Sequence, residues 1–214
     1  MVTNLKNKKI LITAGPTWVA IDKVRVISNI ASGKTGFLLS EELKNIGAIV
    51  TLILGPVGEY CKPNGIKVIN YCYFDELDKI LSREVKSGKY DILIHMAAVS
   101  DFRPAGNFGA KISSSKKQVN LKLVQTAKLI EKIKKINRNI FLVGFKLQPQ
   151  SSRLTLLSSA RKLMKSSGSD LVVANTFKGK DYKAFILDSK RIYASATNKK
   201  AMAKELAATL SDLI

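Results

Sequence analysis

The sequence predicts an α/β protein built on a mostly parallel sheet flanked by helices, with a small extra strand element. Two short apolar runs, Lys9–Ala14 and Ile49–Leu54, each end at a Gly-Pro pair, which is typical of buried parallel strands. A helical pattern separates these runs, and alternating strands and helices indicate crossover connections in a parallel sheet. The 214 residues suffice to bury a sizeable core, and we expect a single domain over residues 1–214.

The first half of the chain supplies one strand-helix-strand unit and the start of a second. Lys9–Ala14 is the first expected strand, and we expect Thr17–Asp22 to be loop. From about Lys34 the apolar spacing predicts a crossover helix, which Gly47 ends, and Ile49–Leu54 is the next strand. The elements that follow are a strand over Ile66–Tyr71, a helix over Phe74–Lys86 and a central strand over Tyr90–Ala97.

A segment rich in glycine, serine and polar residues follows the central strand. Loops at the carboxyl ends of parallel strands are where α/β proteins place their ligands, and we expect a flap-like loop over about residues 102–118. A short strand over Val119–Val124 is expected to stand apart from the sheet. The remaining elements are a helix over Ala127–Ile136, a strand over Ile140–Leu147, a basic helix around Ser158–Ser166, a strand over Leu171–Asn175, paired strands over 183–188 and 191–196, and a helix from about Asn198.

The charge balance favours anionic partners. The chain has 36 Lys and Arg residues against 16 Asp and Glu residues, which gives a net charge of +20. The lysines are scattered and are not gathered with aromatic residues on one module, so a lysine-rich surface that serves small phosphorylated substrates is favoured over nucleic-acid binding. A basic nucleic-acid-binding module is the alternative interpretation.

The sequence carries no sign of a membrane or secretory protein. Its apolar runs are far shorter than the roughly 18 residues of a bilayer span, and the N-terminus lacks the cleavage site of a secretory signal. Cys61 and Cys72 are the only cysteines, and they form neither a metal-ligand spacing nor a disulfide framework. We therefore expect a cytoplasmic protein.

The stretch Val24–Gly36, VRVISNIASGKTG, has the composition of an anion site. It sets an arginine, an asparagine, small hydroxyl residues and a lysine at the expected start of a helix, whose N–H groups can bind phosphate or carboxylate. A P-loop is disfavoured, because that motif requires glycine where Ser28 stands and must follow its strand directly. The segment TAGPTWVA is not a dinucleotide fingerprint, so a nicotinamide-dependent oxidoreductase is the less favoured alternative.

Residues that often serve in nucleophilic catalysis are sparse. His95, the only histidine, lies inside the apolar segment ILIHMAA, where a packed or locally hydrogen-bonded strand histidine is the favoured interpretation. Cys61 and Cys72 have no partner nearby in sequence and are interpreted as packing residues. Asp101 follows a strand, and its interpretations as a turn-capping residue and as a ligand contact stay equally open.

Six short motifs follow one another along most of the chain. They are ITAGPT with D-x-VR-x-ISN-x-x-SGK-x-G within Ile12–Gly36, LGPV at Leu54–Val57, AAVSDFRP at Ala97–Pro104, the lysine of AKISS at Lys111, GFKL at Gly144–Leu147 and DLVVAN at Asp170–Asn175. Together they resemble the phosphopantothenate-cysteine ligase family, also called phosphopantothenoylcysteine synthetase. The resemblance implies a Rossmann-like sheet and a homodimer whose active sites draw on both protomers. GFKL looks like the version in monofunctional ligases, and the chain has no room for the flavin-dependent decarboxylase domain of many bacterial enzymes.

The family that these motifs resemble joins 4′-phosphopantothenate to L-cysteine in coenzyme A biosynthesis. The resemblance implies a nucleoside triphosphate, CTP or ATP, as co-substrate together with Mg²⁺. The substrate carboxylate attacks the α-phosphate, pyrophosphate leaves, and the cysteine amine then displaces the nucleotide from an acyl-nucleotide intermediate. Such a site must hold anions together and neutralise developing charge with fixed donors and cations.

The resemblance also assigns roles to individual residues. Asn29 is the expected catalytic contact to the acyl phosphate, and Lys111, ten residues after Asp101, is expected to bind the triphosphate and to assist catalysis. Arg25, across the dimer interface, and Ala98 would hold phosphopantothenate. The further expected nucleotide contacts are Asp101, Phe145, Lys162 and Lys165, and no residue is assigned to the metal.

Overall fold

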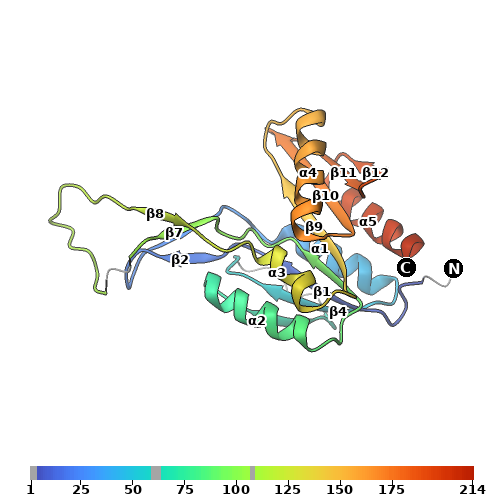
Figure 1. Cartoon of the computed structure of the whole chain (residues 1–214), viewed down its shortest axis with the longest axis horizontal. Helices are drawn as coiled ribbons and strands as arrows, with labels where there is room; N and C mark the ends of the chain where they lie inside the picture. The colour runs from blue at the N-terminus through green and yellow to red at the C-terminus, as the bar shows by residue number, and fades with distance from the viewer. Residues whose placement is uncertain (1–3, 59–63, 107–108) are drawn as a thin grey trace.

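An eight-stranded sheet forms the centre of the computed structural model, which describes residues 4–58, 64–106 and 109–214. Its spatial order is β12-β11-β10-β9-β6-β1-β4-β5 (Figure 1). The strands are β1 (Lys9–Ala14), β4 (Ile49–Leu54), β5 (Lys67–Asn70), β6 (Ile92–His95), β9 (Phe141–Leu147), β10 (Leu171–Lys178), β11 (Asp181–Leu187) and β12 (Ile192–Ala196). All neighbours from β10 to β5 are parallel, whereas β11 and β12 are antiparallel at one edge. The predicted α/β class with a mostly parallel sheet is confirmed.

Helices cover both faces of this sheet. They are α1 (Lys34–Asn45), α2 (Phe74–Lys86), α3 (Leu129–Ile136), α4 (Arg153–Ser167) and α5 (Lys199–Leu213). Helices α1 and α5 pack together on one face, and α2, α3 and α4 cover the other (Figure 1). None of the described helices combines the length and apolar character needed to cross a bilayer.

The central strands are apolar because both of their faces are buried. On β1, Ile10 and Ile12 pack with the layer of α1 and α5, whereas Leu11 packs with the layer of α2 and α3. The chain order reverses beside β1, since β4 pairs with one of its edges and β6 with the other. Such a reversal opens a crevice at the carboxyl ends of the strands, where open α/β sheets bind ligands.

Two small antiparallel sheets extend from the main body. Strands β2 (Trp18–Ala20) and β3 (Val26–Ser28) pair in one, and β7 (Phe102–Pro104) and β8 (Leu123–Gln125) pair in the other. We call the described residues of 18–28 and 102–125 the arm, which projects to the left in Figure 1. The prediction of a small strand element apart from the main sheet is confirmed.

Several local predictions differ from the structure. Thr17–Asp22 was expected to be loop, but part of it forms β2, because three-residue strands obtain their pairing from tertiary contacts rather than from their own pattern. Helix α4 begins at Arg153, five residues before the expected basic helix, because Ser152 caps it with a hydrogen bond of 3.2 Å from the Thr155 N–H to its Oγ. Strands β3 and β7 are not predicted, β7 lying in the segment expected to be a flap-like loop, and β8 begins four residues after the start of the expected strand Val119–Val124. The remaining strands and helices lie where the sequence predicts them, within about three residues at each end.

Gly36 lets the first turn of α1 rest directly on the end of β1. A Cβ atom at Gly36 would lie 2.4 Å from the Cβ of Ala14, a separation that real side chains do not tolerate. We expect Gly36→Ala to lower the free energy of unfolding, because overpacking costs typically about 1–3 kcal/mol, against up to about 1 kcal/mol that alanine gains over glycine in a helix.

Urea unfolding of Gly36→Ala measures this effect, and Gly106→Ala is a matched control because a Cβ atom there meets nothing within 4 Å. An unchanged or raised unfolding midpoint in Gly36→Ala contradicts the packing argument.

His95 is a buried strand histidine, as the sequence predicts. Its Nδ1 shares a hydrogen bond of 2.9 Å with Thr13 Oγ1, and burial lowers the pKa of the imidazole to about 4. In the unfolded chain the imidazole has its ordinary pKa of about 6.5, so it binds a proton at a higher pH than the folded chain does. The free energy of unfolding should therefore fall as the pH drops from about 6.5 to about 4, by up to about 1.4 kcal/mol per pH unit.

Urea unfolding between pH 7 and pH 4 checks this pH dependence. His95→Asn removes the titrating ring, so its stability should fall less steeply over the same range than that of the wild-type chain. If the stability of both chains falls equally steeply with decreasing pH, groups other than His95 cause the loss of stability in acid.

Candidate functional site

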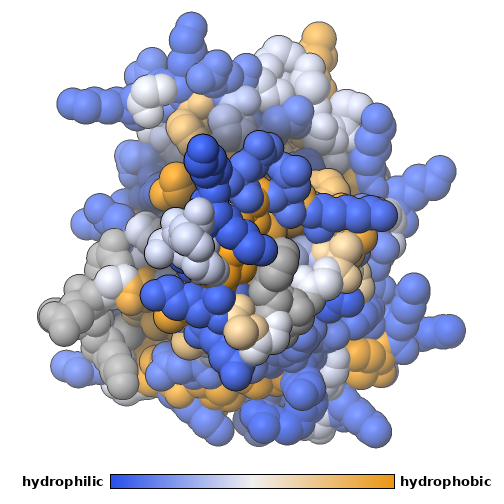
Figure 2. Space-filling view, turned by 90° about the vertical axis from the view of Figure 1, so that its left-hand side faces the viewer, coloured by the Kyte–Doolittle hydropathy of each residue, from blue (hydrophilic) through white to orange (hydrophobic). Residues whose placement is uncertain are grey.

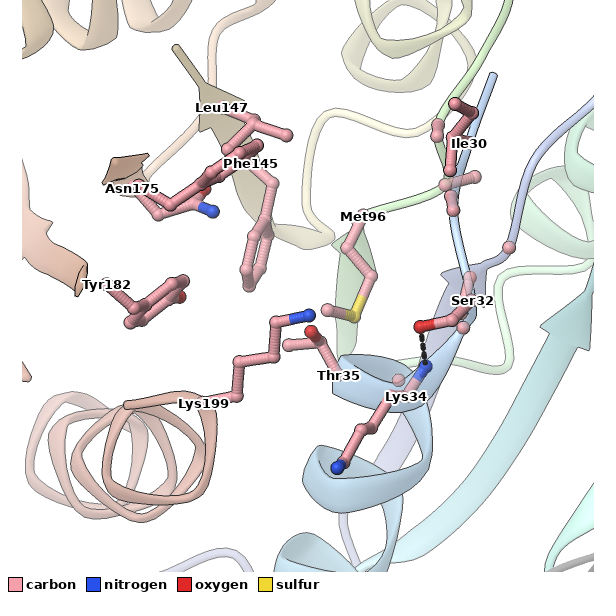
Figure 3. Close-up of a pocket in the computed structure, with 18 of the residues that line it drawn as sticks. Ile30, Ser32, Lys34, Thr35, Met96, Phe145, Leu147, Asn175, Tyr182 and Lys199 are labelled. Atoms are coloured by element: carbon pink, nitrogen blue, oxygen red, sulfur yellow. Dashed lines mark hydrogen bonds between the residues drawn. The ribbon is translucent and has the colours of Figure 1, made fainter. Parts of the chain in front are cut away.

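A cavity of about 560 Å³ lies at the carboxyl ends of β1, β6, β9 and β10, next to the reversal of chain order. Its size is typical of small-molecule sites, and its position is the one at which open α/β sheets bind ligands. The turn into α1, the hairpin between β10 and β11, and the start of α5 complete its lining (Figure 3).

The N-terminus of α1 forms one side of this cavity. Gly33 occupies the helix cap in the left-handed region with φ 69°, and it offers no side chain to cap the helix. Ser32 Oγ lies 3.4 Å from the N–H of Lys34, which is a long contact (Figure 3). No acidic residue occupies the first turn, so the positive end of α1 faces the cavity without a neutralising charge. This arrangement suits a phosphate or carboxylate and agrees with the anion site expected within Val24–Gly36.

Apolar side chains from the strands form the opposite wall. Phe145 projects from β9, with Met96 just beyond β6 and Tyr182 from β11 on either side of it (Figure 3). Leu147 and Ile30 are lining residues that stay exposed to solvent. A flat aromatic ligand group would find ring faces and apolar contacts here.

The charged residues of the cavity are all cationic. Lys199, in the first turn of α5, points toward Thr35 and Met96, whereas the Lys34 side chain points away from them (Figure 3). Lys180, in the hairpin between β10 and β11, is also a lining residue. The lining includes no Asp or Glu, and in the described ranges no three His, Cys, Asp or Glu side chains could hold a metal ion together. The cavity therefore favours an anionic ligand.

Two buried amide oxygens lie near the end of β9, one on Gln148 just after this strand and one on Asn175 of the neighbouring strand β10. Asn175 lines the cavity. The backbone oxygen of Asn175 accepts a hydrogen bond of 2.9 Å from the backbone N–H of Gln148. Asn175 Oδ1 and Gln148 Oε1 are both buried and have no hydrogen-bond partner among the described residues. Orphan acceptors beside a cavity indicate a place for donors from a ligand or from water.

Three of the residues expected at the site lie at or beside the cavity. Ala98 and Phe145 are lining residues, and Asn29 Nδ2 donates hydrogen bonds of 3.0 Å to the Ala98 oxygen and 3.2 Å to the Val99 oxygen. Because only the nitrogen of the amide can donate to these oxygens, the orientation of the Asn29 side chain is fixed. Among the described residues, Asn29 donates through Nδ2 and its Oδ1 accepts no hydrogen bond.

Of the other expected residues of the first half, Arg25 and Lys111 belong to the arm, and Asp101 directly precedes its second segment. Arg25 Nη1 lies 2.8 Å from Asp22 Oδ2, and Asp101 Oδ1 lies 2.5 Å from Lys128 Nζ. Lys111 is exposed in the segment that precedes β8. None of Arg25, Asp101 and Lys111 lines the cavity of its own chain.

Lys162 and Lys165 lie on α4, apart from the cavity. Together with Leu154, Leu157 and Arg161 they line a separate groove of about 330 Å³ along the helix. Cys61 lies outside the described residues. Cys72 is a free, partly buried thiol and lines no part of the cavity.

Lys180, Lys199 and Asn175 line the cavity but are not singled out by the sequence, unlike Lys34 of the expected anion site. Lys199 follows the helix cap Asn198, and Asn175 ends the DLVVAN motif, so each lay next to a recognised signal. Neither signal places the residue at the cavity, because that placement depends on β11 and β12 carrying α5 beside α1.

Comparison with known proteins shows relatives in coenzyme A biosynthesis. The chain is 41% identical over 177 residues, or 82% of its length, to the coenzyme A biosynthesis bifunctional protein CoaBC of Thermococcus kodakarensis. It is 34% identical over 209 residues, or 94% of its length, to the protein of the same name from Borreliella burgdorferi. The chain spans 43% and 52% of these two relatives.

A solved structure and a family model also match this chain. The crystal structure of the DNA/pantothenate metabolism flavoprotein from Streptococcus pneumoniae matches with a TM-score of 0.86 and 27% identity, over 97% of this chain and 100% of that one. The model of the DNA/pantothenate metabolism flavoprotein C-terminal domain matches residues 5–213. Since this match covers nearly the whole chain, the protein belongs to the family of the DNA/pantothenate metabolism flavoprotein C-terminal domain.

Proposed function

We propose that this protein is a cytoplasmic phosphopantothenate-cysteine ligase that uses CTP or ATP in coenzyme A biosynthesis. The observation that carries the proposal is the hydrogen bonding of Asn29 to Ala98 and Val99, beside a cavity onto which the uncapped N-terminus of α1 opens. Family membership and the CoaBC relatives support the same pathway.

In the proposed complex the nucleotide occupies the cavity at the ends of the strands. Its base packs against Phe145 and Tyr182, and its phosphates lie toward the N-terminus of α1 and Lys199. Mg²⁺ enters with the triphosphate as part of the substrate, held by phosphate oxygens and water, because no carboxylate lines the cavity.

The chemistry then proceeds next to Asn29. A carboxylate oxygen of 4′-phosphopantothenate attacks the α-phosphorus, and the bond to the bridging oxygen breaks to release pyrophosphate. The cysteine amine next attacks the acyl carbon, loses a proton, and expels the nucleoside monophosphate. The helix end and the lysines stabilise the negative charge that develops on phosphorus, and the site positions the reactants without a protein nucleophile.

We propose that the arm completes the active site of a partner subunit in a homodimer. Arg25, which the resemblance assigns to phosphopantothenate, and Lys111, which it assigns to the triphosphate, lie on the arm and do not line the cavity of their own chain. Exposed apolar residues of the arm include Val24, Phe102, Leu123 and Val124. The face of the molecule seen from the arm's side shows hydrophobic patches between hydrophilic side chains (Figure 2). Such side chains favour burial against a second copy of the chain.

Lys162 and Lys165 also lie outside the cavity of their own chain. They keep their proposed role as phosphate contacts, in the same homodimer, for a ligand of the partner subunit. Asp101 keeps its proposed nucleotide role, since Lys128 contacts only its Oδ1 and the carboxylate stays largely exposed. No observation favours a nucleic-acid-binding module or a nicotinamide-dependent oxidoreductase.

The purified protein should release pyrophosphate from CTP or ATP only when 4′-phosphopantothenate is present, and should form the amide product only when L-cysteine is added. A coupled pyrophosphate assay with mass spectrometry of the product measures both steps. Lack of turnover with every nucleoside triphosphate contradicts the proposed function.

Asn29→Asp is the matched variant for this assay, and it should lower the rate of product formation by at least about 100-fold while the chain stays folded. The new carboxylate cannot donate to the oxygens of Ala98 and Val99, and it adds negative charge where anions must bind. A near-normal rate would remove Asn29 from the mechanism.

A heterodimer that combines Lys111→Ala in one subunit with Lys199→Ala in the other tests the shared site. If the arm of one subunit serves the cavity of the other, one of the two sites contains both substitutions and the other contains neither. The heterodimer, purified by two different tags, should then keep about half of the wild-type rate, whereas both homodimeric variants are impaired. Loss of activity in the heterodimer as well would assign arm and cavity to the same chain.

A further inference from the structure

The carboxylate of Asp22 joins two parts of the arm that are far apart in sequence. Its Oδ1 accepts hydrogen bonds of 2.8 Å from the backbone N–H groups of Val24 and Arg25. Its Oδ2 accepts 2.8 Å from Arg25 Nη1 and 3.0 Å from the N–H of Ile112, which lies 90 positions later in the chain. One buried side chain therefore holds both the β2–β3 turn and the segment before β8.

Ile112 is held from both sides of its backbone. Its N–H donates to Asp22, and its backbone oxygen accepts a hydrogen bond of 3.2 Å from Arg25 Nη1. The Ile112 side chain is also buried, although most of its neighbours in the segment 109–118 are exposed. Because Lys111 is the preceding residue, its backbone has little freedom relative to Arg25.

The electrostatics of this cluster favour a permanent contact. The pKa of Asp22 is lowered to about 2, mainly by the hydrogen bond from the Ile112 N–H. The N–H groups of Val24 and Arg25 and the Arg25 charge lower this pKa further, whereas burial opposes the shift. The carboxylate is therefore ionised over the whole range in which enzymes of this kind work.

Asp22 differs from an aspartate that only shapes a local turn. Asp188, between β11 and β12, also accepts two backbone N–H groups through Oδ1, from Lys190 and Arg191, and a third donor, the Tyr193 hydroxyl, through Oδ2. All partners of Asp188 lie within five residues, whereas Asp22 reaches across 90. A turn alone would not require the contact to Ile112.

We propose that Asp22 is a positioning residue that fixes Arg25 and Lys111 as a pair, so that both cations meet the phosphate groups of the substrates together. This inference rests on the proposed function for the role of the two cations. Asp22 itself is buried and touches no substrate; it acts through the two residues that it holds.

The first test is amide hydrogen exchange in the full-length protein. In Asp22→Asn the side chain keeps one acceptor oxygen for the turn and loses the second, so the Ile112 amide should exchange at least about tenfold faster than in wild type. Asp188→Asn, with the same change in a local turn, should leave the Ile112 amide unaffected. Unchanged exchange at Ile112 in Asp22→Asn overturns the proposal, whatever reaction the protein catalyses.

The second test is a double-mutant cycle on the rate of product formation. Asp22→Asn should lower kcat/KM at least about tenfold in the wild-type chain, but less than about threefold in a chain that already carries Lys111→Ala. Equal factors in both backgrounds would mean that Asp22 does not act through Lys111, and would overturn its positioning role. If no chain turns over any nucleoside triphosphate, the proposed function fails, and hydrogen exchange alone decides whether Asp22 joins the two segments.

Discussion

The candidate site depends on how closely α1 approaches the end of β1. Gly36 leaves no space between the helix and Ala14, so the first helical turn sits directly on the strand end. From the other side, the buried Tyr71 hydroxyl lies 3.1 Å from the Ala14 oxygen and 3.2 Å from the Gly15 oxygen, and donates toward both. These contacts hold the turn after β1 in place. The N-terminus of α1 packs against the strand end beside this turn, so the direction of the helix dipole toward the cavity is fixed as well.

The acidic side chains of this basic protein mostly hold the fold together. Asp22 and Asp188 fix turns, Glu84 binds Lys89 and the Tyr90 hydroxyl, and Asp101 pairs with Lys128. No acidic residue lines the cavity. The net charge of +20 is therefore not spread evenly over the protein. The lysines of the cavity have no carboxylate beside them in the lining, so their charge is available to anionic ligands.

The sequence predicts the main sheet well and the geometry of the site only in part. Strands β1 and β4 and helix α2 have their predicted bounds, because buried runs that end at Gly-Pro and a strongly amphipathic helix are local signals. Within Val24–Gly36, however, the structure places the residues in two locations, since Arg25 lies on the arm and the Gly33 turn lies at the cavity. No local pattern reports that separation, nor the approach of Lys199, because both result from contacts between distant parts of the chain.

The hairpin of β10 and β11 has a consequence for how proteins of this kind diversify. It forms the cavity wall that holds Asn175 and Tyr182, and it turns at Gly179 near the antiparallel edge of the sheet. In the sheet, β9 and β6 separate this hairpin from β1. In the proposed enzyme, the wall that would contact the nucleobase and the helix end that would contact the phosphates therefore belong to separate elements, so substitutions can alter one without altering the other.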